Sequence, residues 1–306
     1  MEPKEAYQAV LKEVRKKIAG KEEVIEQMFV AIIADGNVLL EGVPGVAKTT
    51  MTKTLADVIQ ASFGRVQGTP DLGIRDIVGY TYADADNNLQ LKKGPIFSNM
   101  LLIDEMNRMP PKTTTALLEA LEEKIVTMGD STLDLPKPFI AFATQNPLNI
   151  EGTEQLPKVL TDRFLIRIAV GYPTAEEEQQ MLRIKETESS VQVNKILGVE
   201  DIIEMQGKLN TVKISDGLIK YITDIVNASR TDLHVVMGGS PRAEISFMKC
   251  AKARALVQGR SEVTVDDIKA LARPVLSHRI AVRATGGIGV NGVIDGLIAS
   301  VPAPTS

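Results

Sequence analysis

Residues 41–50 read EGVPGVAKTT, a glycine-rich stretch that ends in a lysine and two threonines. The stretch departs from the pattern G-x-x-x-x-G-K-[ST] at one position, because Ala47 stands where the pattern has glycine. The segment NVLL at 37–40 suits a buried strand, and residues 49–59 have helical periodicity. The stretch therefore joins a strand to a helix, which is the structural context that this pattern requires.

Successive backbone N–H groups in such a turn converge on an anion, and the positive end of the following helix points at the same place. Lys48 is spaced to reach the β and γ phosphates of a nucleotide, and the hydroxyl of Thr49 is spaced to bind Mg²⁺. The residues expected to contact the nucleotide are Gly42, Val43, Pro44, Gly45, Val46, Ala47, Lys48, Thr49 and Thr50. Taken alone, the stretch also fits an ordinary glycine turn before a helix.

The backbone angle at residue 47 decides whether alanine suits the turn. At a negative φ, alanine fits and stabilises the fold by about 0.4–1 kcal/mol relative to glycine, because it lowers the entropy of the unfolded chain. At a positive φ, alanine costs free energy. We predict that Ala47 has a negative φ and is helical or nearly so.

The composition is that of a globular protein long enough for two domains. Of its 306 residues, 44% are hydrophobic and 24% charged, and no long apolar run or signal-like N-terminus is present, so we predict a cytoplasmic protein without a membrane span. A single cysteine excludes a disulfide framework, and two histidines far apart in the sequence argue against a zinc site. A net charge of -4 and 4% aromatic residues make nucleic-acid binding unlikely.

Further apolar runs predict the rest of an α/β fold with a mostly parallel sheet. They lie at 100–103, at 139–144 and, in a more alternating form that suggests an edge strand, at 165–170. Helical patterns such as 112–123 separate some of them. This order predicts helices packed against a parallel sheet.

Two insertions and a second domain complete the predicted organisation. Residues 124–135 read as a hairpin before the third strand, and 68–97 read as an irregular excursion. After Gly171 the strand signals nearly vanish, which predicts an α/β domain over 1–171 and a helical domain over 172–306. The expected helices of the second domain are 174–188, 197–208, 215–229, 241–258 and 265–273, with a proline-led start after Ser240 and a capping box at 264–267.

Polar side chains follow two of the predicted strands. Asp104 and Glu105 end the second, where one acid suits the hydrated Mg²⁺ and the other suits the activation of water. Asn146 follows the third strand and is placed to point its amide at the γ phosphate or at the attacking water. Each also fits a bland alternative: a solvated strand end for the acids, and a turn residue before Pro147 for the asparagine.

Two arginines are further candidates. Arg242 lies in the first turn of a helix, where a cation opposes the helix dipole by roughly 0.3–1 kcal/mol, so an anionic partner is expected there. Glu244 is one such partner, and a bound phosphate is the other. Arg163 fits either a surface arginine or an arginine supplied to a neighbouring subunit, a role worth about 10³ to 10⁵ in rate in other NTPases.

Several segments together, and in this order, resemble the MoxR family of AAA+ ATPases, in the helix-2-insert group that also contains magnesium chelatase subunits and dynein-related proteins. The segments are EGVPGVAKTT, VQGTPDLGIRDIVG, GPIFSNMLLIDEMNR, PPKTTTALLEALEEKIVT, FIAFATQNP, EGTEQLPKVLTDRF, GSPRAEI and VLSHRI. They span nearly the whole chain. One departure is Gly36-Asn37, where many relatives have Gly-His before the first strand.

The resemblance implies a role for each candidate residue. It implies Walker A at 42–49, Walker B ending at Asp104 with Glu105 as general base, sensor 1 at Asn146, the arginine finger at Arg163 and sensor 2 at Arg242. It also implies a helix-2 insert over about 70–97 and a hairpin over 124–135, both facing a pore or a substrate. Arg108, in DEMNR, is typical of the family too, and either it or Arg163 is the dominant arginine at the subunit interface.

Family members usually form rings, most often hexamers, and are thought to act as chaperones that mature partner complexes, often with a protein carrying a von Willebrand factor A domain. The resemblance therefore implies a Mg²⁺-dependent ATPase whose oligomer remodels a partner, with the helical lid moving against the α/β domain. Three alternatives remain open: a DNA-directed motor, a magnesium-chelatase-like subunit, and a nucleotide-binding scaffold without hydrolysis.

Overall fold

The computed structural model describes residues 1–306 except for 129–130, 147–155, 188–190, 284–286 and 305–306. The turn expected near 129–131 lies partly outside the described residues. Pro147 and the first residues of the segment EGTEQLPKVLTDRF lie outside them as well.

Five parallel strands form the central sheet, in the order β2-β5-β8-β1-β9. They are β2 (Phe63–Gln67), β5 (Met100–Asp104), β8 (Ile140–Gln145), β1 (Val38–Glu41) and β9 (Ile166–Ala169). The prediction of an α/β fold with a parallel sheet is confirmed, and β9 lies at an edge as expected. Strand β2 was not predicted, because Gly64 and Arg65 interrupt its apolar pattern.

Both faces of the sheet are buried, because successive side chains of a strand point to opposite faces. On one face Leu40, Leu102 and Phe142 belong to a core that includes α1 (Pro3–Val14), α2 (Glu22–Ile33) and α3 (Lys48–Ile59). On the other, Leu39, Leu101 and Ala141 pack with α4 (Ile74–Val78), the 3-10 helix η1 (Met106–Arg108) and α5 (Pro111–Glu123). This burial explains why these strands read as continuous apolar runs.

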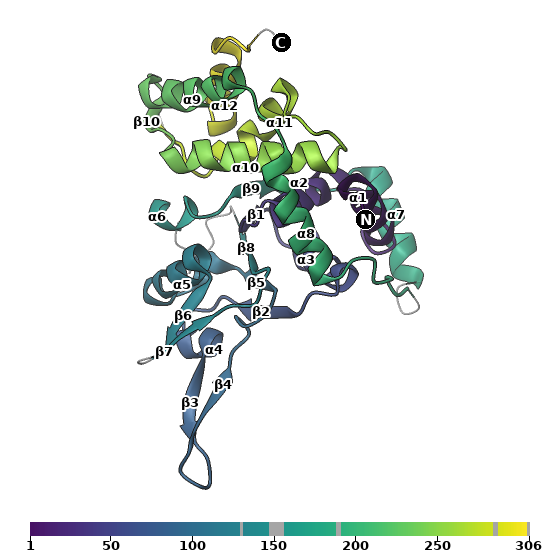
Figure 1. The fold of residues 1–306 in the computed structure, drawn as a ribbon, viewed down its shortest axis with the longest axis vertical. Helices are drawn as coiled ribbons and strands as arrows, with labels where there is room; N and C mark the ends of the chain where they lie inside the picture. Colours follow the sequence, from purple (N-terminus) through teal and green to yellow (C-terminus); the bar gives the residue numbers. More distant parts are fainter. Residues whose placement is uncertain (129–130, 147–155, 188–190, 284–286, 305–306) are drawn as a thin grey trace.

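The chain from residue 175 onward is mainly helical. Its elements are α7 (Ala175–Thr187), α8 (Val199–Lys208), the 3-10 helix η3 (Leu209–Thr211), α9 (Asp216–Thr231), β10 (Val235–Met237), α10 (Pro241–Val257), α11 (Val265–Leu276), β11 (Ala281–Val282) and α12 (Val290–Ser300). The predicted start of α10 after Ser240 and the capping box formed by Thr264 and Asp267 are confirmed. Helices α8 to α11 share one buried core with α1 and α2, and Figure 1 shows α10 lying between α9 and α2.

Two short antiparallel pairs stand apart from the central sheet. Strands β3 (Gly79–Ala83) and β4 (Leu89–Lys93) form an arm that projects from the end of the molecule opposite α9 and α12 (Figure 1). The prediction of an irregular excursion here is wrong, because the segment contains α4 and these two strands. The strands are largely exposed, so their sequence has no apolar periodicity that would indicate them. Strands β6 (Ile125–Met128) and β7 (Ser131–Asp134) form the second pair.

Two further features are relevant to the sites below. Helix α6 (Lys158–Thr161) is a single turn that leads into β9. Among the helices of the described residues, none has the length and apolarity needed to cross a membrane.

Candidate nucleotide-binding site

The loop over residues 42–47 leaves the carboxyl end of β1 and enters α3 at Lys48. Gly42 is required by close packing, since a Cβ atom there would lie 2.4 Å from the carbonyl oxygen of Val170. Gly45 has φ +89°, and a Cβ atom there would meet nothing within 4 Å. Gly45 therefore combines a backbone angle that favours glycine with an open side of the loop.

Ala47 has φ +64° and ψ +21°, so the prediction of a negative φ is wrong. The left-handed conformation lies directly before the first residue of α3, where the chain turns from the loop into the helix. Such a conformation costs a residue with a Cβ atom about 1–2 kcal/mol, and glycine at this position of the pattern avoids the cost. The geometry of the turn overrides the preference of the alanine. Successive backbone N–H groups in turns of this kind form a concave surface that suits an anion.

The Lys48 side chain folds back over the loop. Its Nζ donates hydrogen bonds to the carbonyl oxygens of Gly42, at 2.6 Å, and Val43, at 2.9 Å. Burial lowers the pKa of Lys48, and the nearby charges of Asp104 and Glu105 oppose the shift. The partly desolvated ammonium group therefore lies beside the loop and two carboxylates.

Asp104 ends β5 and accepts hydrogen bonds from three side chains. The hydroxyl of Thr49 donates to Oδ2 at 3.0 Å, Arg65 Nη2 donates to the same oxygen at 2.9 Å, and the hydroxyl of Thr144 donates to Oδ1 at 2.8 Å. The hydroxyl of Thr49 and the Asp104 carboxylate, the two groups predicted to bind Mg²⁺, are thus adjacent. Hard oxygen ligands of this kind suit Mg²⁺, which keeps several of its waters and binds through few protein groups.

Glu105 adopts a left-handed backbone conformation with φ +55°. Its backbone N–H donates to Thr144 Oγ1 at 2.9 Å, so one threonine hydroxyl holds both acids of the pair. The carboxylate of Glu105 accepts a hydrogen bond from Arg108 Nη1 at 2.6 Å. Thr144 was not singled out from the sequence, because only the pairing of β5 with β8 brings it beside Asp104.

A cavity of about 500 Å³ joins these groups, and its volume lies in the range usual for small-ligand sites. The loop residues from Pro44 to Thr50 line it, together with Asp104, Glu105 and Asn146. Its other wall consists of Lys17 to Lys21, without Gly20, and of Pro173, Glu177, Met181 and Lys185 at α7. The sequence does not indicate this wall, because it forms only where the α1–α2 connection and α7 come together in the fold.

Arg163 and Arg242 do not line this cavity. Arg163 precedes β9, and the backbone N–H of Leu165 donates to the carbonyl oxygen of Asn37, which precedes β1. The two arginines therefore lie near the amino ends of β1 and β9, whereas the loop follows the carboxyl end of β1. Each of these strands has four residues, so about 13 Å of strand separates the two edges.

Both arginines pair with one carboxylate. Arg163 Nε donates to Glu122 Oε2 at 2.7 Å, and Arg242 Nη2 donates to Glu122 Oε1. Glu244, the side-chain partner considered for Arg242, accepts instead from Arg230 Nη2 at 3.1 Å. The resemblance implies a sensor 2 role for Arg242, and in this structure its side chain pairs with Glu122 outside the cavity around residues 42–50.

Comparison with known proteins agrees with the geometry. The model of the ATPase family associated with various cellular activities matches residues 37–166, and the AAA lid domain model matches 227–288. The model of the MoxR domain in MoxR-vWA-beta-propeller ternary systems matches residues 5–65. The chain is 38% identical to Chaperone MoxR1 of Mycobacterium tuberculosis, across 88% of this chain and 74% of that protein. The chain belongs to the MoxR family of AAA+ ATPases.

The same MoxR-family chain is similar to other proteins over most of its length. It is 38% identical to the Bacillus subtilis protein YeaC, across 95% of this chain and 92% of that protein. The crystal structure of a Cytophaga hutchinsonii protein matches its fold with a TM-score of 0.91 at 36% identity, across 99% of this chain and 96% of that one.

Proposed function

We propose that this MoxR-family chain hydrolyses ATP in a Mg²⁺-dependent reaction in the cavity around residues 42–50. The observation that carries the proposal is the hydrogen bond of 3.0 Å from Thr49 Oγ1 to Asp104 Oδ2, beside the ammonium group of Lys48. Backbone N–H groups of the loop and Lys48 would bind the phosphates. When bound to Thr49 and Asp104, Mg²⁺ would neutralise the charge that develops on the transferred phosphoryl group.

Glu105 would accept the proton of the attacking water, and Asn146 would orient that water or the γ phosphate. The pair between Glu105 and Arg108 leaves Glu105 able to take this role. Both side chains are more than a third exposed, so the pair contributes little stability and separates at little cost. Substitution of Glu105 tests this assignment directly.

Arg163 and Arg242 would act on the nucleotide of a neighbouring copy, within a hexameric ring of identical chains. Their distance from the loop of their own chain supports this proposal, as does their pairing with a single carboxylate, that of Glu122. Arginine side chains that reach a neighbouring active site stabilise the charge of the transition state. The mixing experiment described next also compares the contributions of Arg163 and Arg108.

Mixing two inactive variants tests the arrangement between copies. Arg163→Ala subunits keep an intact phosphate site, and Glu105→Gln subunits keep an intact arginine, so mixed assemblies should regain part of the ATPase rate. The matched experiments use Arg242→Ala and Arg108→Ala in place of Arg163→Ala. The absence of any regained activity with all three arginine variants would rule out action between copies.

The hydrolysis cycle would remodel a partner protein, with motion of the helices after residue 175 as the coupling element. The name of the relative Chaperone MoxR1 and the description of MoxR domains in systems with von Willebrand factor A proteins support this proposal. A Glu105→Gln variant with ATP should retain the partner in affinity capture from the native cytoplasm, whereas a Lys48→Ala variant should not. Equal retention by the two variants would contradict nucleotide-dependent remodelling.

A further inference from the structure

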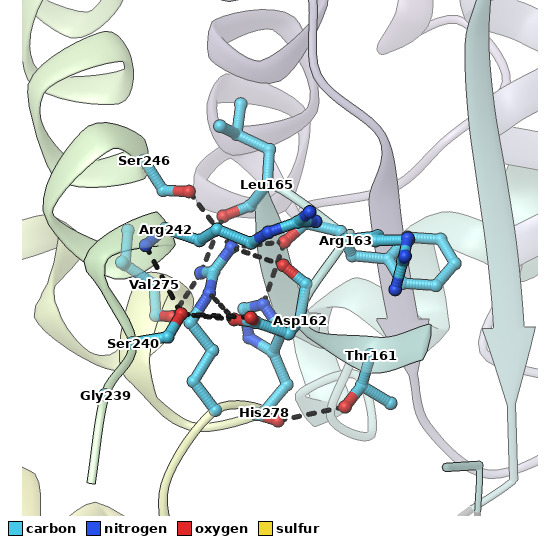
Figure 2. A network of polar contacts seen from close by, with 12 residues as sticks. Thr161, Asp162, Arg163, Leu165, Gly239, Ser240, Arg242, Ser246, Val275 and His278 are labelled. Atoms are coloured by element: carbon cyan, nitrogen blue, oxygen red, sulfur yellow. Dashed lines mark hydrogen bonds and ion pairs between the residues drawn. The ribbon is translucent and has the colours of Figure 1, made fainter. Parts of the chain in front are cut away.

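Arg279 is a buried cation outside the nucleotide cavity, and the proposed reaction gives it no role. Only 3% of its surface is exposed, and it follows the carboxyl end of α11. All three guanidinium nitrogens donate hydrogen bonds. Figure 2 shows Ser240, Arg242 and Ser246, at and after the start of α10, facing the segment that contains Asp162 and Arg163.

One set of contacts fixes the backbone on both sides of Arg163. Arg279 Nη2 donates to the carbonyl oxygens of Asp162, at 3.2 Å, and Phe164, at 2.6 Å. Arg279 Nη1 donates to the carbonyl oxygen of Leu165 at 3.1 Å. The residues immediately before and after Arg163 are thus bound to the same rigid group.

A second set of contacts reaches the first turns of α10, which carry Arg242. Arg279 Nε donates to Asp162 Oδ1 at 2.9 Å, and the same carboxylate accepts the hydroxyl of Ser240 at 2.9 Å through Oδ2. Ser240 caps α10 and accepts the backbone N–H of Arg242 at 3.3 Å. Arg279 Nη2 also donates to Ser246 Oγ at 3.0 Å. A single side chain therefore links the Arg163 segment to the helix start that carries Arg242.

The chemistry of the group explains why an arginine suits this place. A guanidinium is planar and presents five N–H donors in a fixed fork, so contacts to several acceptors define its position and theirs. A further hydrogen bond, from Nη1 to the carbonyl oxygen of Val275 at 2.6 Å, ties the group to α11. Stability alone does not require a buried ion pair, because well-packed apolar side chains often serve as well.

We propose that Arg279 is a positioning residue that sets Arg163 and Arg242 in the geometry needed to reach the nucleotide of a neighbouring copy. This inference rests on the proposed action of these arginines between copies. Arg279 touches neither nucleotide nor water in this account. It acts only through the backbone around Arg163 and the start of α10.

The main test is Arg279→Lys in the full chain, assayed for ATP hydrolysis and for nucleotide binding. We expect kcat to fall on the order of 10²-fold, as for a displacement of about 1 Å in a catalytic group, with the Kd for ATP unchanged. Mixing with Glu105→Gln subunits should restore part of the rate, because those subunits supply correctly placed arginines. The triple variant Arg163→Ala/Arg242→Ala/Arg279→Lys should be no slower than Arg163→Ala/Arg242→Ala, since Arg279 acts only through these two arginines.

A matched control separates positioning from general stability. Arg260 also pairs with a buried carboxylate, that of Asp267, but at the far end of α10. Arg260→Lys should lower the Tm and leave kcat unchanged. If Arg279→Lys does not fold, Asp162→Asn provides the second variant, because it keeps the shape of the side chain and removes the charge that Arg279 and Ser240 share. Asp162→Asn should lower kcat and leave the Kd for ATP unchanged. Mixing with Glu105→Gln subunits should restore part of its ATPase rate.

The outcomes distinguish this inference from the proposed function. Full ATPase activity of Arg163→Ala and Arg242→Ala would overturn the proposed function and this inference with it. A strong defect in Arg163→Ala, together with a wild-type kcat in Arg279→Lys, would overturn this inference alone. A loss of activity from Arg279→Lys that adds to that of Arg163→Ala/Arg242→Ala, or that Glu105→Gln subunits do not restore, would overturn it as well.

Discussion

Arg163 and Arg242 share one carboxylate, that of Glu122 in α5. Burial raises the pKa of Glu122, but the hydrogen bonds from the two guanidinium groups outweigh it, so the pKa is lowered overall. The carboxylate is therefore ionised and neutralises part of the charge of the two arginines. Because these arginines are proposed to meet a phosphate of another copy, Glu122 would hold them near their working positions in the isolated chain.

Glu122→Gln should change the free energy of unfolding by less than about 1 kcal/mol, because the Glu122 side chain is 40% exposed and pairs of this kind contribute little. The ATPase rate should stay within a few-fold of the wild-type rate, since the arginines, and not the acid, are proposed to act on the phosphate. Urea unfolding and a steady-state ATPase assay measure the two quantities. A loss of activity as large as that of Arg163→Ala would show that Glu122 has a direct role.

Ala47→Gly should stabilise the protein by up to about 1.6 kcal/mol. The substitution relieves a left-handed strain of about 1–2 kcal/mol and adds about 0.4–1 kcal/mol of unfolded-state entropy cost. Urea unfolding measures the difference. The control is Ala116→Gly, at an exposed position within α5, which should destabilise by about 0.5–1 kcal/mol. Equal destabilisation by the two substitutions would contradict the positive φ at residue 47.

Thr144→Val should lower kcat by about 10²-fold, because the hydroxyl holds both the Asp104 carboxylate and the backbone N–H of Glu105. Valine keeps the shape but leaves both groups without this partner. Thr114→Val is the control, since Thr114 is also buried and donates its hydroxyl to the carbonyl oxygen of Pro110, away from the cavity. A wild-type kcat in Thr144→Val would show that the hydroxyl of Thr144 does not contribute to catalysis.

Stability should fall as the pH drops below about 6.5. Burial holds the pKa of His278 well below its ordinary value, and the charge of Arg279 adds to the shift. In this window the unfolded chain binds a proton that the folded chain does not, so the free energy of unfolding should decrease by about 1.4 kcal/mol per pH unit. The loss continues until the pH reaches the pKa of His278 in the folded state.

Unfolding of wild-type and His278→Gln proteins between pH 7 and pH 5 measures this slope. The variant should lose it, because its side chain does not titrate, whereas carboxylates with lowered pKa values such as Glu122 and Asp267 contribute only at more acidic pH. A slope that persists in His278→Gln would assign the effect to another group.

The sequence predicted the parts of the fold that local patterns determine. Apolar runs identified β1, β5 and β8, because both of their faces are buried, and cap residues located the starts of α10 and α11. Strand β2 carries Gly64 and Arg65, so its half-buried pattern was too weak to identify. The β3–β4 arm has little burial and therefore no periodicity to detect.

The residues of the site could be predicted where they belong to sequence motifs, but contacts that depend on tertiary structure could not. The motif spacing gave the adjacency of Thr49 and Asp104, which the structure contains. The angle at Ala47 was mispredicted because a local preference was weighed without the turn that overrides it. The pairing of Arg242 with Glu122 joins α10 to α5, and no local pattern in either helix indicates it.

We propose that ATP is hydrolysed in the cavity around Lys48 with Glu105 as the base. The most direct measurement is the Kd for ATP and the hydrolysis rate of Glu105→Gln, with Mg²⁺ present and after its removal by a chelator. Glu105→Gln should have a Kd close to that of the wild type and a rate reduced by about 10² to 10⁴-fold, and the wild type should not hydrolyse ATP without Mg²⁺. Wild-type turnover in Glu105→Gln would contradict the role of Glu105 as the base.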